Sequence, residues 1–227
     1  MTGVLGVDRS ADALVLAPGV YAPQSDTRLL ADALAREPLR PGAEVLDVGT
    51  GTGALALAAA RRGARVTAVD RSRRAVAATR LNAALARQRV RVLRGDLLAP
   101  AAGRRFDLIV CNPPYVPAPS PGVPRRGAAV AWDAGHDGRA VLDRLCDGAA
   151  GLLHPSGALL LVHSALSGVR ATLDRLHAGG LDADVVERHV VPFGPVLRSR
   201  ADWLERRGLV VPGEEKEELV IIRAERL

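Results

Sequence analysis

A short apolar run that leads into a glycine-rich turn, at residues 44–53, constrains the fold of this chain more than any other stretch. Asp47 lies near the end of the run, and glycines follow at alternate positions, Gly49, Gly51 and Gly53, before an alanine-rich helical pattern. The stretch predicts a strand, a tight turn and a helix. Such a turn lets the backbone approach a bound nucleoside without Cβ clashes, and the helix directs free N–H groups at the ligand. Its G-x-G-x-G spacing differs from the G-x-G-x-x-G of dinucleotide-binding proteins.

Strands and helices are predicted to alternate along most of the chain, which indicates parallel pairing with right-handed crossovers and helices on both faces. We therefore expect an α/β fold with a doubly wound, mostly parallel, seven-stranded Rossmann-like sheet. A helix that starts at Asp26 and ends before Pro38 precedes the first strand. The predicted strands are residues 44–48, 65–69, 90–93, 106–110, 158–162, 183–188 and 219–224, and the later helices are residues 54–62, 73–86, 139–153 and 169–178.

The length of 227 residues is sufficient for one domain with a sizeable core, and no proline-rich stretch divides the chain into halves. We expect a single domain over residues 1–227. Residues 192–218 are too long for a hairpin turn and carry three prolines, which predicts an insertion with a short helix at residues 201–207. Two interpretations of this insertion are equally good: a lid over a substrate, or a surface element with no role in the site. The charged run at residues 214–218 predicts a solvated turn.

Composition limits the compartment and the partners. No apolar run is long enough to span a bilayer, and residues 1–13 carry acids and no continuous apolar core, so we expect neither a membrane anchor nor a secretory signal. Two cysteines suit a reducing compartment and match no metal site, so we interpret the protein as cytoplasmic and free of metal. A net charge of +6 permits an acidic partner such as nucleic acid, but the arginines are scattered among acids, so nucleic acid binding stays open.

The glycine turn and the segment Asn112-Pro113-Pro114-Tyr115 together resemble the class I S-adenosylmethionine-dependent methyltransferases, in which D-x-G-x-G-x-G is the cofactor loop and N-P-P-Y marks enzymes that methylate planar amino nitrogens. Within that group the chain is similar to the HemK family of protein-glutamine methyltransferases, specifically its short branch without an N-terminal substrate domain. The resemblance runs over residues 20–161. Residues 20–27 resemble V-Y-x-P-x-x-D-T, with Ser25 in place of an acid, and residues 131–139 resemble A-W-x-G-G-x-D-G-R, with Ala134 in place of a glycine.

This resemblance implies a methyltransferase fold, S-adenosylmethionine as cofactor, and methyl transfer to a glutamine side-chain amide of a protein such as a release factor. It also implies a small zinc-binding activator subunit as a partner. Two other hypotheses stay open on the residues alone. One is an enzyme that methylates a nucleobase amino group or a small metabolite, and the other is a cofactor-binding module without turnover.

Three acids at the ends of predicted strands suit the parts of S-adenosylmethionine. Asp70 follows the glycine turn by about twenty residues, where an acid accepts both ribose hydroxyls, and helix capping is the alternative role. Asp96 suits the adenine amino group and Leu97 the adenine edge, although an Asp there also suits a turn. Asp47 suits the cofactor's ammonium group, and the glycines that follow it leave room for the carboxylate. By resemblance, Tyr21 and Thr27 also belong to the cofactor site, with capping as the alternative for Thr27.

Asn112 is the residue that we expect to carry the reaction, and we also expect it to line the cofactor site. An amide or exocyclic amino nitrogen is a poor nucleophile because its lone pair is delocalised, so the site must hold and aim it. The side-chain carbonyl of Asn112 and the main-chain carbonyl of Pro113 can each accept one N–H of an NH₂ group. The paired prolines stiffen this backbone, and the Tyr115 ring can pack against a flat substrate group. A proline-stiffened turn after a buried strand is the plainer interpretation.

Overall fold

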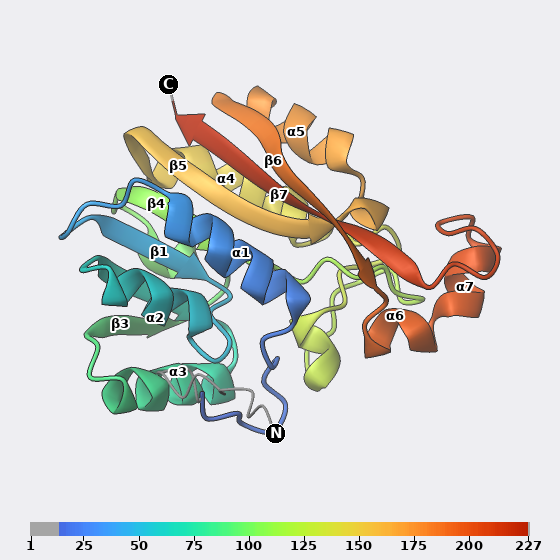
Figure 1. Ribbon diagram of the computed structural model, residues 1–227, viewed down its shortest axis with the longest axis horizontal. Coiled ribbons are helices and arrows are strands. Elements are labelled where there is room, and N and C mark those ends of the chain that lie inside the picture. The colour runs from blue at the N-terminus through green and yellow to red at the C-terminus, as the bar shows by residue number, and fades with distance from the viewer. Residues whose placement is uncertain (1–13, 227) are drawn as a thin grey trace, which may run out of the picture.

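A seven-stranded sheet with the order β3-β2-β1-β4-β5-β7-β6 forms the centre of the computed structural model, which describes residues 14–226 (Figure 1). Strands β1 to β5 pair in parallel, and β7 runs antiparallel to both β5 and β6. The prediction of a doubly wound, mostly parallel sheet is therefore confirmed, whereas the expectation for residues 1–13 lies outside the described residues. The strands are β1 (Glu44–Val48), β2 (Arg65–Asp70), β3 (Val90–Arg94), β4 (Phe106–Cys111), β5 (Leu153–Ser164), β6 (Leu181–Pro192) and β7 (Lys216–Arg226).

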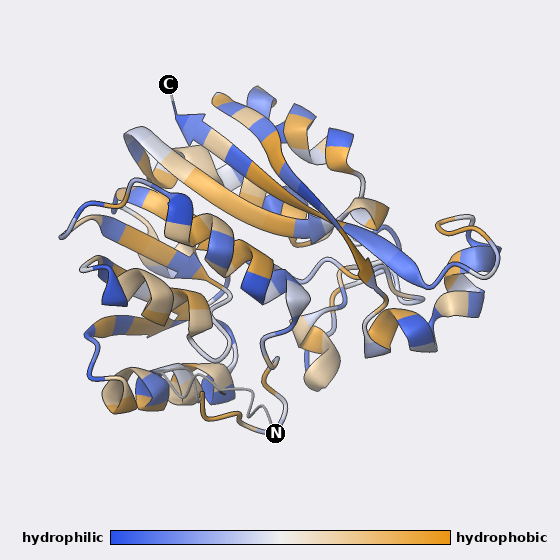
Figure 2. Cartoon of the chain, viewed as in Figure 1, coloured by the Kyte–Doolittle hydropathy of each residue, from blue (hydrophilic) through white to orange (hydrophobic). Residues whose placement is uncertain are grey.

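Helices cover both faces of the sheet, and every strand except the edge strand β6 supplies apolar side chains to both faces. On β1, Val45 packs with the side chains of α1, α2 and α3, whereas Leu46 and Val48 pack with those of α4 and α5. Because successive strand residues point to opposite faces, an apolar strand in this position is buried on both sides. Figure 2 shows the same pattern, with β5 largely hydrophobic. The helices are α1 (Ser25–Arg36), α2 (Ala54–Arg61), α3 (Arg73–Leu85), α4 (Leu142–Ala149) and α5 (Val169–Ala178).

The predicted helix at residues 139–153 is wrong in its extent. Helix α4 ends at Ala149, a short 3₁₀ turn follows, and β5 already begins at Leu153. Two glycines, Gly148 and Gly151, weaken a helix at this point because glycine has a low helix propensity. The early start of β5 is accommodated by a register shift in its pairing with β4, between Phe106 and Leu108.

The last two strands are longer than predicted, which shortens the insertion to residues 193–215. β6 and β7 pair from Leu181 and Arg226 to Pro192 and Lys216. The sequence hides this length because β6 lies at the sheet edge, where buried or half-buried residues alternate with exposed ones that are often charged. The insertion holds α6 (Pro195–Ser199) and α7 (Ala201–Arg206), the second of which is the predicted short helix.

The charged run at residues 214–218 is only partly a turn, because β7 begins at Lys216. Glu217 is 8% exposed, so the prediction that the whole run is solvated is wrong. Figure 2 shows this end of β7 as a hydrophilic stretch beside α6 and α7. Across residues 14–226, none of the helices combines the length and the apolar character needed to cross a membrane.

Candidate active site

A cavity of about 1020 Å³ opens where β1, β2 and β4 end at their carboxyl termini. This is the edge of an open α/β sheet at which ligands bind. The segment before α1 closes one side of it, and the loop after β4 closes another. Asp47, Pro113 and Tyr115 are absent from its lining. The cavity brings together the other predicted residues, which are Tyr21, Thr27, Gly49, Gly51, Asp70, Asp96, Leu97 and Asn112.

The glycine turn adopts the backbone that its sequence predicts. The φ angles of Gly49, Gly51 and Gly53 are +73°, +56° and +88°, in the left-handed region that glycine enters without a Cβ penalty. The turn is fastened to β2, because the Gly49 N–H donates to the Val69 carbonyl at 2.8 Å and the Gly51 N–H donates to Asp70 Oδ2 at 3.0 Å. The turn is therefore held rigidly beside the cavity.

Asp47 lies beneath the turn, where it is 1% exposed. Its Oδ2 accepts hydrogen bonds from the Thr50 hydroxyl at 2.6 Å and from the Ala56 N–H at 3.0 Å. Its Oδ1 has no partner within residues 14–226, and burial raises the pKa of this carboxyl to about 7. Asp47 thus braces the turn and the first turn of α2 from below.

Two other acids line the cavity after β2 and β3. Asp70 accepts from the Ser72 N–H at 2.8 Å as well as from Gly51, and burial raises its pKa. Ser72 is the residue that caps α3, so the alternative capping role does not fall to Asp70. Asp96 is about half exposed and forms an ion pair with Arg144 at 2.5 Å, a partner that no sequence pattern indicated.

A set of hydrogen bonds connects Asn112 to the start of α1. The Asn112 Nδ2 donates to Thr27 Oγ1 at 3.2 Å, and the Thr27 hydroxyl donates to Asp26 Oδ1 at 3.2 Å. The hydroxyls of Tyr21 and Tyr115 both donate to Asp26 Oδ2 at 3.0 Å. Asp26 also accepts from the Thr27 N–H at 2.6 Å. Three predicted residues therefore bond to one carboxylate, and Asn112 is connected to it through Thr27.

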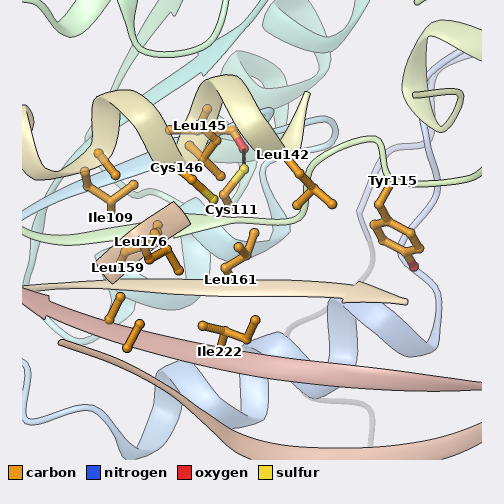
Figure 3. Close-up of a cluster of buried hydrophobic side chains, with 14 of the residues drawn as sticks. Ile109, Cys111, Tyr115, Leu142, Leu145, Cys146, Leu159, Leu161, Leu176 and Ile222 are labelled. Atoms are coloured by element: carbon orange, nitrogen blue, oxygen red, sulfur yellow. Dashed lines mark hydrogen bonds between the residues drawn. The ribbon is translucent and has the colours of Figure 1, made fainter. Parts of the chain in front are cut away.

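The Tyr115 ring belongs to the buried core. It is 7% exposed, and Figure 3 shows it at the edge of the cluster, with Leu142 as the nearest labelled side chain and its hydroxyl pointing away from the leucine side chains. The main-chain carbonyl oxygen of Tyr115 accepts a hydrogen bond from the Ser167 hydroxyl at 2.7 Å, and burial raises the pKa of the Tyr115 phenol. The ring lines a second pocket of about 70 Å³, next to the large cavity, so the predicted contact with a substrate is limited to that pocket.

This small pocket is shared by the start of α1, the end of the Asn112 loop, Trp132 and the insertion. Tyr21 lines both this pocket and the large cavity, so it forms their common wall. Glu217 also lines the small pocket, and its Oε2 has no partner within the described part of the chain. Burial, with a smaller effect of Asp26, raises the pKa of Glu217 to about 7.

The insertion is fixed to the loop that follows Asn112. Arg200 donates to the Pro117 carbonyl at 3.0 Å, and its guanidinium lies 2.6 Å from Asp133 Oδ1, with little exposure of either side chain. Phe193 and Leu204 are buried in the same core as Tyr115. The insertion therefore forms part of the wall beside the site.

Sequence reasoning missed four residues of this site. Asp26 had a signal, since it belongs to the segment at residues 20–27, but a capping role accounted for it. No sequence signal indicated Arg144, Arg200 or Glu217, because each reaches the site from an element far away in the chain. Within residues 14–226 no group of three or more His, Cys, Asp or Glu side chains is placed to hold a metal ion.

The sheet order, the glycine turn after β1, the acid at the end of β2 and the Asn112 segment after β4 define a class I S-adenosylmethionine-dependent methyltransferase. The chain matches the family model of the methyltransferase small domain over residues 13–120. It is also similar, with a TM-score of 0.63 and 27% identity, to a chain of the E. cuniculi Mtq2–Trm112 complex, responsible for the methylation of the eRF1 translation termination factor. That match covers 92% of this chain and 99% of the other.

Curated relatives narrow the class to one family. A putative protein N5-glutamine methyltransferase of Methanocaldococcus jannaschii is 33% identical over 185 residues, which cover 81% of this chain and 92% of the relative. The release factor glutamine methyltransferase of Salmonella typhimurium is 42% identical over 172 residues, which cover 71% of this chain but only 62% of the relative. The chain belongs to the HemK family of protein-glutamine methyltransferases.

The residues of the cavity fit S-adenosylmethionine. A Cβ added to Gly49 or Gly51 would lie 3.8 Å from the carbonyl oxygens of Asn112 and Tyr21, so side chains here would fill the cradle. Gly53 provides no side-chain cap for α2, and Asp47 accepts from the Ala56 N–H, so the N–H groups of Ala54 and Leu55, which line the cavity, are left to suit a carboxylate.

Proposed function

We propose that this protein transfers a methyl group from S-adenosylmethionine to the side-chain amide of a glutamine, and that the glutamine belongs to a release factor. The observation that carries the proposal is the orientation of Asn112 at the cavity. Its NH₂ group is bonded to Thr27, which leaves the side-chain carbonyl oxygen for the acceptor. The names of the relatives and the eRF1-methylating neighbour support the choice of substrate.

We propose that the cofactor is held by groups from three strand ends. S-Adenosylmethionine supplies a methyl group that is activated by its positive sulfur. Asp70 accepts from the ribose hydroxyls, Asp96 and Leu97 hold the adenine, and the start of α2 receives the carboxylate near Gly49 and Gly51. Tyr21 and Thr27 line the amino-acid end of the cofactor in this proposal. Asp47 acts from below by bracing the glycine turn.

The acceptor amide is held by carbonyl oxygens. Asn112 Oδ1, at the cavity, accepts one N–H of the glutamine NH₂ group. The main-chain carbonyl oxygen of Pro113, a buried residue next to the cavity lining in the chain, accepts the other once the acceptor is bound. Two fixed acceptors orient the nitrogen lone pair toward the methyl donor, which lowers the entropic part of the barrier. Tyr115 supports this loop through its buried ring and its bond to Asp26.

We also propose the context in which the enzyme works. Residues 1–227 form one catalytic domain, in which the insertion at residues 193–215 is a fixed wall of the acceptor site, held by Arg200. A small zinc-binding activator subunit is proposed as a partner, since the E. cuniculi neighbour is part of a complex with Trm112. A release factor substrate places the reaction in the cytoplasm, where translation ends.

Methylation of a purified release factor tests the function directly. The full chain, with labelled S-adenosylmethionine, is expected to label the protein, and mass spectrometry is expected to place the methyl group on one glutamine. Asn112→Ala is expected to abolish labelling while it retains cofactor binding in calorimetry, because the amide lies at the acceptor end of the cavity. Labelling of RNA or of a small molecule in place of the protein, with Asn112→Ala still active, contradicts the proposal.

A further inference from the structure

Asp26 lies at the centre of the hydrogen bonds around Asn112, although the proposed chemistry gives it no contact with acceptor or cofactor. It lies in the first turn of α1 and is 4% exposed. One carboxylate oxygen accepts from the hydroxyls of Tyr21 and Tyr115, and the other accepts from the N–H and the hydroxyl of Thr27. Such a concentration of donors on a buried carboxylate calls for an account beyond helix capping.

The direction of these bonds determines which way the Asn112 side chain faces. A carboxylate only accepts hydrogen bonds, so the single hydroxyl proton of Thr27 is committed to Asp26. Thr27 Oγ1 then offers only lone pairs, and Asn112 must turn its NH₂ group toward it, at 3.2 Å. The carbonyl oxygen of the same amide consequently faces away from Thr27, which is the orientation that the acceptor NH₂ needs.

We propose that Asp26 is a positioning residue that, through Thr27, fixes the Asn112 amide with its carbonyl oxygen toward the acceptor. The inference rests on the proposed function, in which Asn112 holds an NH₂ group. Without the carboxylate, Thr27 can donate its proton to Asn112 Oδ1, and the amide turns over. The Asn112 NH₂ group then faces the NH₂ group of the acceptor glutamine. Both groups are hydrogen-bond donors, so the bond that holds the acceptor is lost.

A purely structural role for Asp26 predicts different behaviour. If the carboxylate only anchors Tyr21 and Tyr115, its replacement lowers the melting temperature and weakens cofactor and acceptor binding together. If it sets the direction of the Asn112 amide, turnover falls far more than cofactor affinity. The glycine turn, Asp70 and Asp96 bond to other partners, and only Tyr21 and Thr27 connect Asp26 to the proposed cofactor site.

Asp26→Asn is the sharpest variant, because it keeps the shape of the side chain but adds donors that can bond to Thr27 Oγ1. Turnover of the release factor at saturation is expected to fall by roughly 10- to 100-fold, the effect of one misdirected hydrogen bond, with the Kd for S-adenosylmethionine changed less than about twofold. Thr27→Val is expected to show the same loss of turnover, with a larger change in Kd because Thr27 also lines the cavity, and the double variant is expected to lose no more turnover, as for groups that act as one unit. Thr27→Ser is expected to recover most of what Thr27→Val loses.

Asp32→Asn provides the matched control, since it makes the same change at an exposed position of the same helix. The NMR signal of the Asn112 side-chain NH₂ group, assigned by its absence in Asn112→Ala, is expected to shift in Asp26→Asn and to stay in place in Asp32→Asn. An unchanged signal in Asp26→Asn, or a parallel loss of cofactor affinity, overturns the proposal. The signal requires no acceptor, so a wild-type chain that leaves the release factor unmethylated refutes only the proposed function.

Discussion

The two halves of the sheet build their parts of the site in different ways. In the parallel half, β1 to β4, each functional residue lies at the end of a strand or in the next few positions, as Asp70 and Asn112 do. In the antiparallel half, β5 to β7, the contributing residues are separated from the motifs by about a hundred positions, as Arg200 and Glu217 are. Local geometry therefore determines the cofactor side, and distant packing determines the proposed acceptor side.

This difference separates the two binding steps. The glycine turn is held by backbone bonds to Val69 and by Asp70, all within the parallel half. The small pocket and its walls depend on Arg200 and on the buried start of β7. We therefore expect substitutions in the parallel half to change cofactor affinity, and substitutions around the insertion to change acceptor binding and turnover.

The largest expected effect comes from a glycine pair, Gly53 in the glycine turn and Gly138 in the loop between β4 and α4, which packs against the turn after β5 at Ser167. In Gly138→Ala the new Cβ would lie 2.2 Å from the Tyr115 carbonyl oxygen and 2.6 Å from Ser167 Oγ, at a φ of +71°. Because backbone must move, we expect a loss of roughly 3 kcal/mol in the free energy of unfolding and about 6–12 °C in Tm. In Gly53→Ala, also at a positive φ, the new Cβ would lie 2.9 Å from the Thr79 methyl group and no closer than 3.4 Å to backbone, so the melting temperature is expected to fall less. Equal thermal shifts in the two variants would refute this difference.

Asp70→Asn is expected to raise the Kd for S-adenosylmethionine by roughly 10- to 100-fold, the loss of a charged hydrogen-bond acceptor to the ribose. The KM for the release factor is expected to change little, since the acceptor lies at the other side of the cavity. Calorimetry with the cofactor alone measures the first effect. Asp182→Asn, an exposed acid on β6, serves as the control and is expected to bind as wild type. Normal cofactor affinity in Asp70→Asn would remove this residue from the cofactor site.

Arg200→Ala is expected to raise the KM for the release factor by roughly 10-fold while cofactor affinity is retained, because the insertion loses its attachment to the Asn112 loop. It also leaves the carboxylate of Asp133 buried without its ion-pair partner, so the melting temperature is expected to fall by a few degrees. Arg206→Ala, an exposed arginine on α7, is the matched control. An unchanged KM in Arg200→Ala would show that the insertion takes no part in binding the release factor.

The smallest expected effect is the contribution of Glu217 to the pH dependence of the free energy of unfolding. Burial raises its pKa to about 7, so the folded chain binds a proton that the unfolded chain releases between about pH 4.5 and 7. Stability from this group is present below that window and is lost as the pH rises through it. Glu217→Gln is expected to flatten the pH dependence of Tm between pH 5 and 8, by a few degrees. Asp47, whose pKa is also about 7, keeps part of the slope in the variant.

The cofactor side was predictable because its signals are local. The glycines at 49, 51 and 53 require a backbone that few other residues adopt, and Asp70 follows a strand whose apolar pattern is plain. The helix at 139–153 and the strand at 183–188 were misjudged for the opposite reason. Their extents depend on pairing and register with β4 and β7, which the local pattern does not contain.

The sequence by itself determined the order of strands and helices, the glycine turn, and the residue types around Asn112, because these follow from backbone sterics and apolar periodicity. The tertiary structure alone decided that Asp47 lies beneath the turn, that the Tyr115 ring faces the core, and that Glu217 is buried. It also decided that Asp26 accepts hydrogen bonds from the hydroxyls of both Tyr21 and Tyr115. Burial and hydrogen-bond direction depend on which distant segments come into contact, and these contacts form only when the whole sheet is assembled.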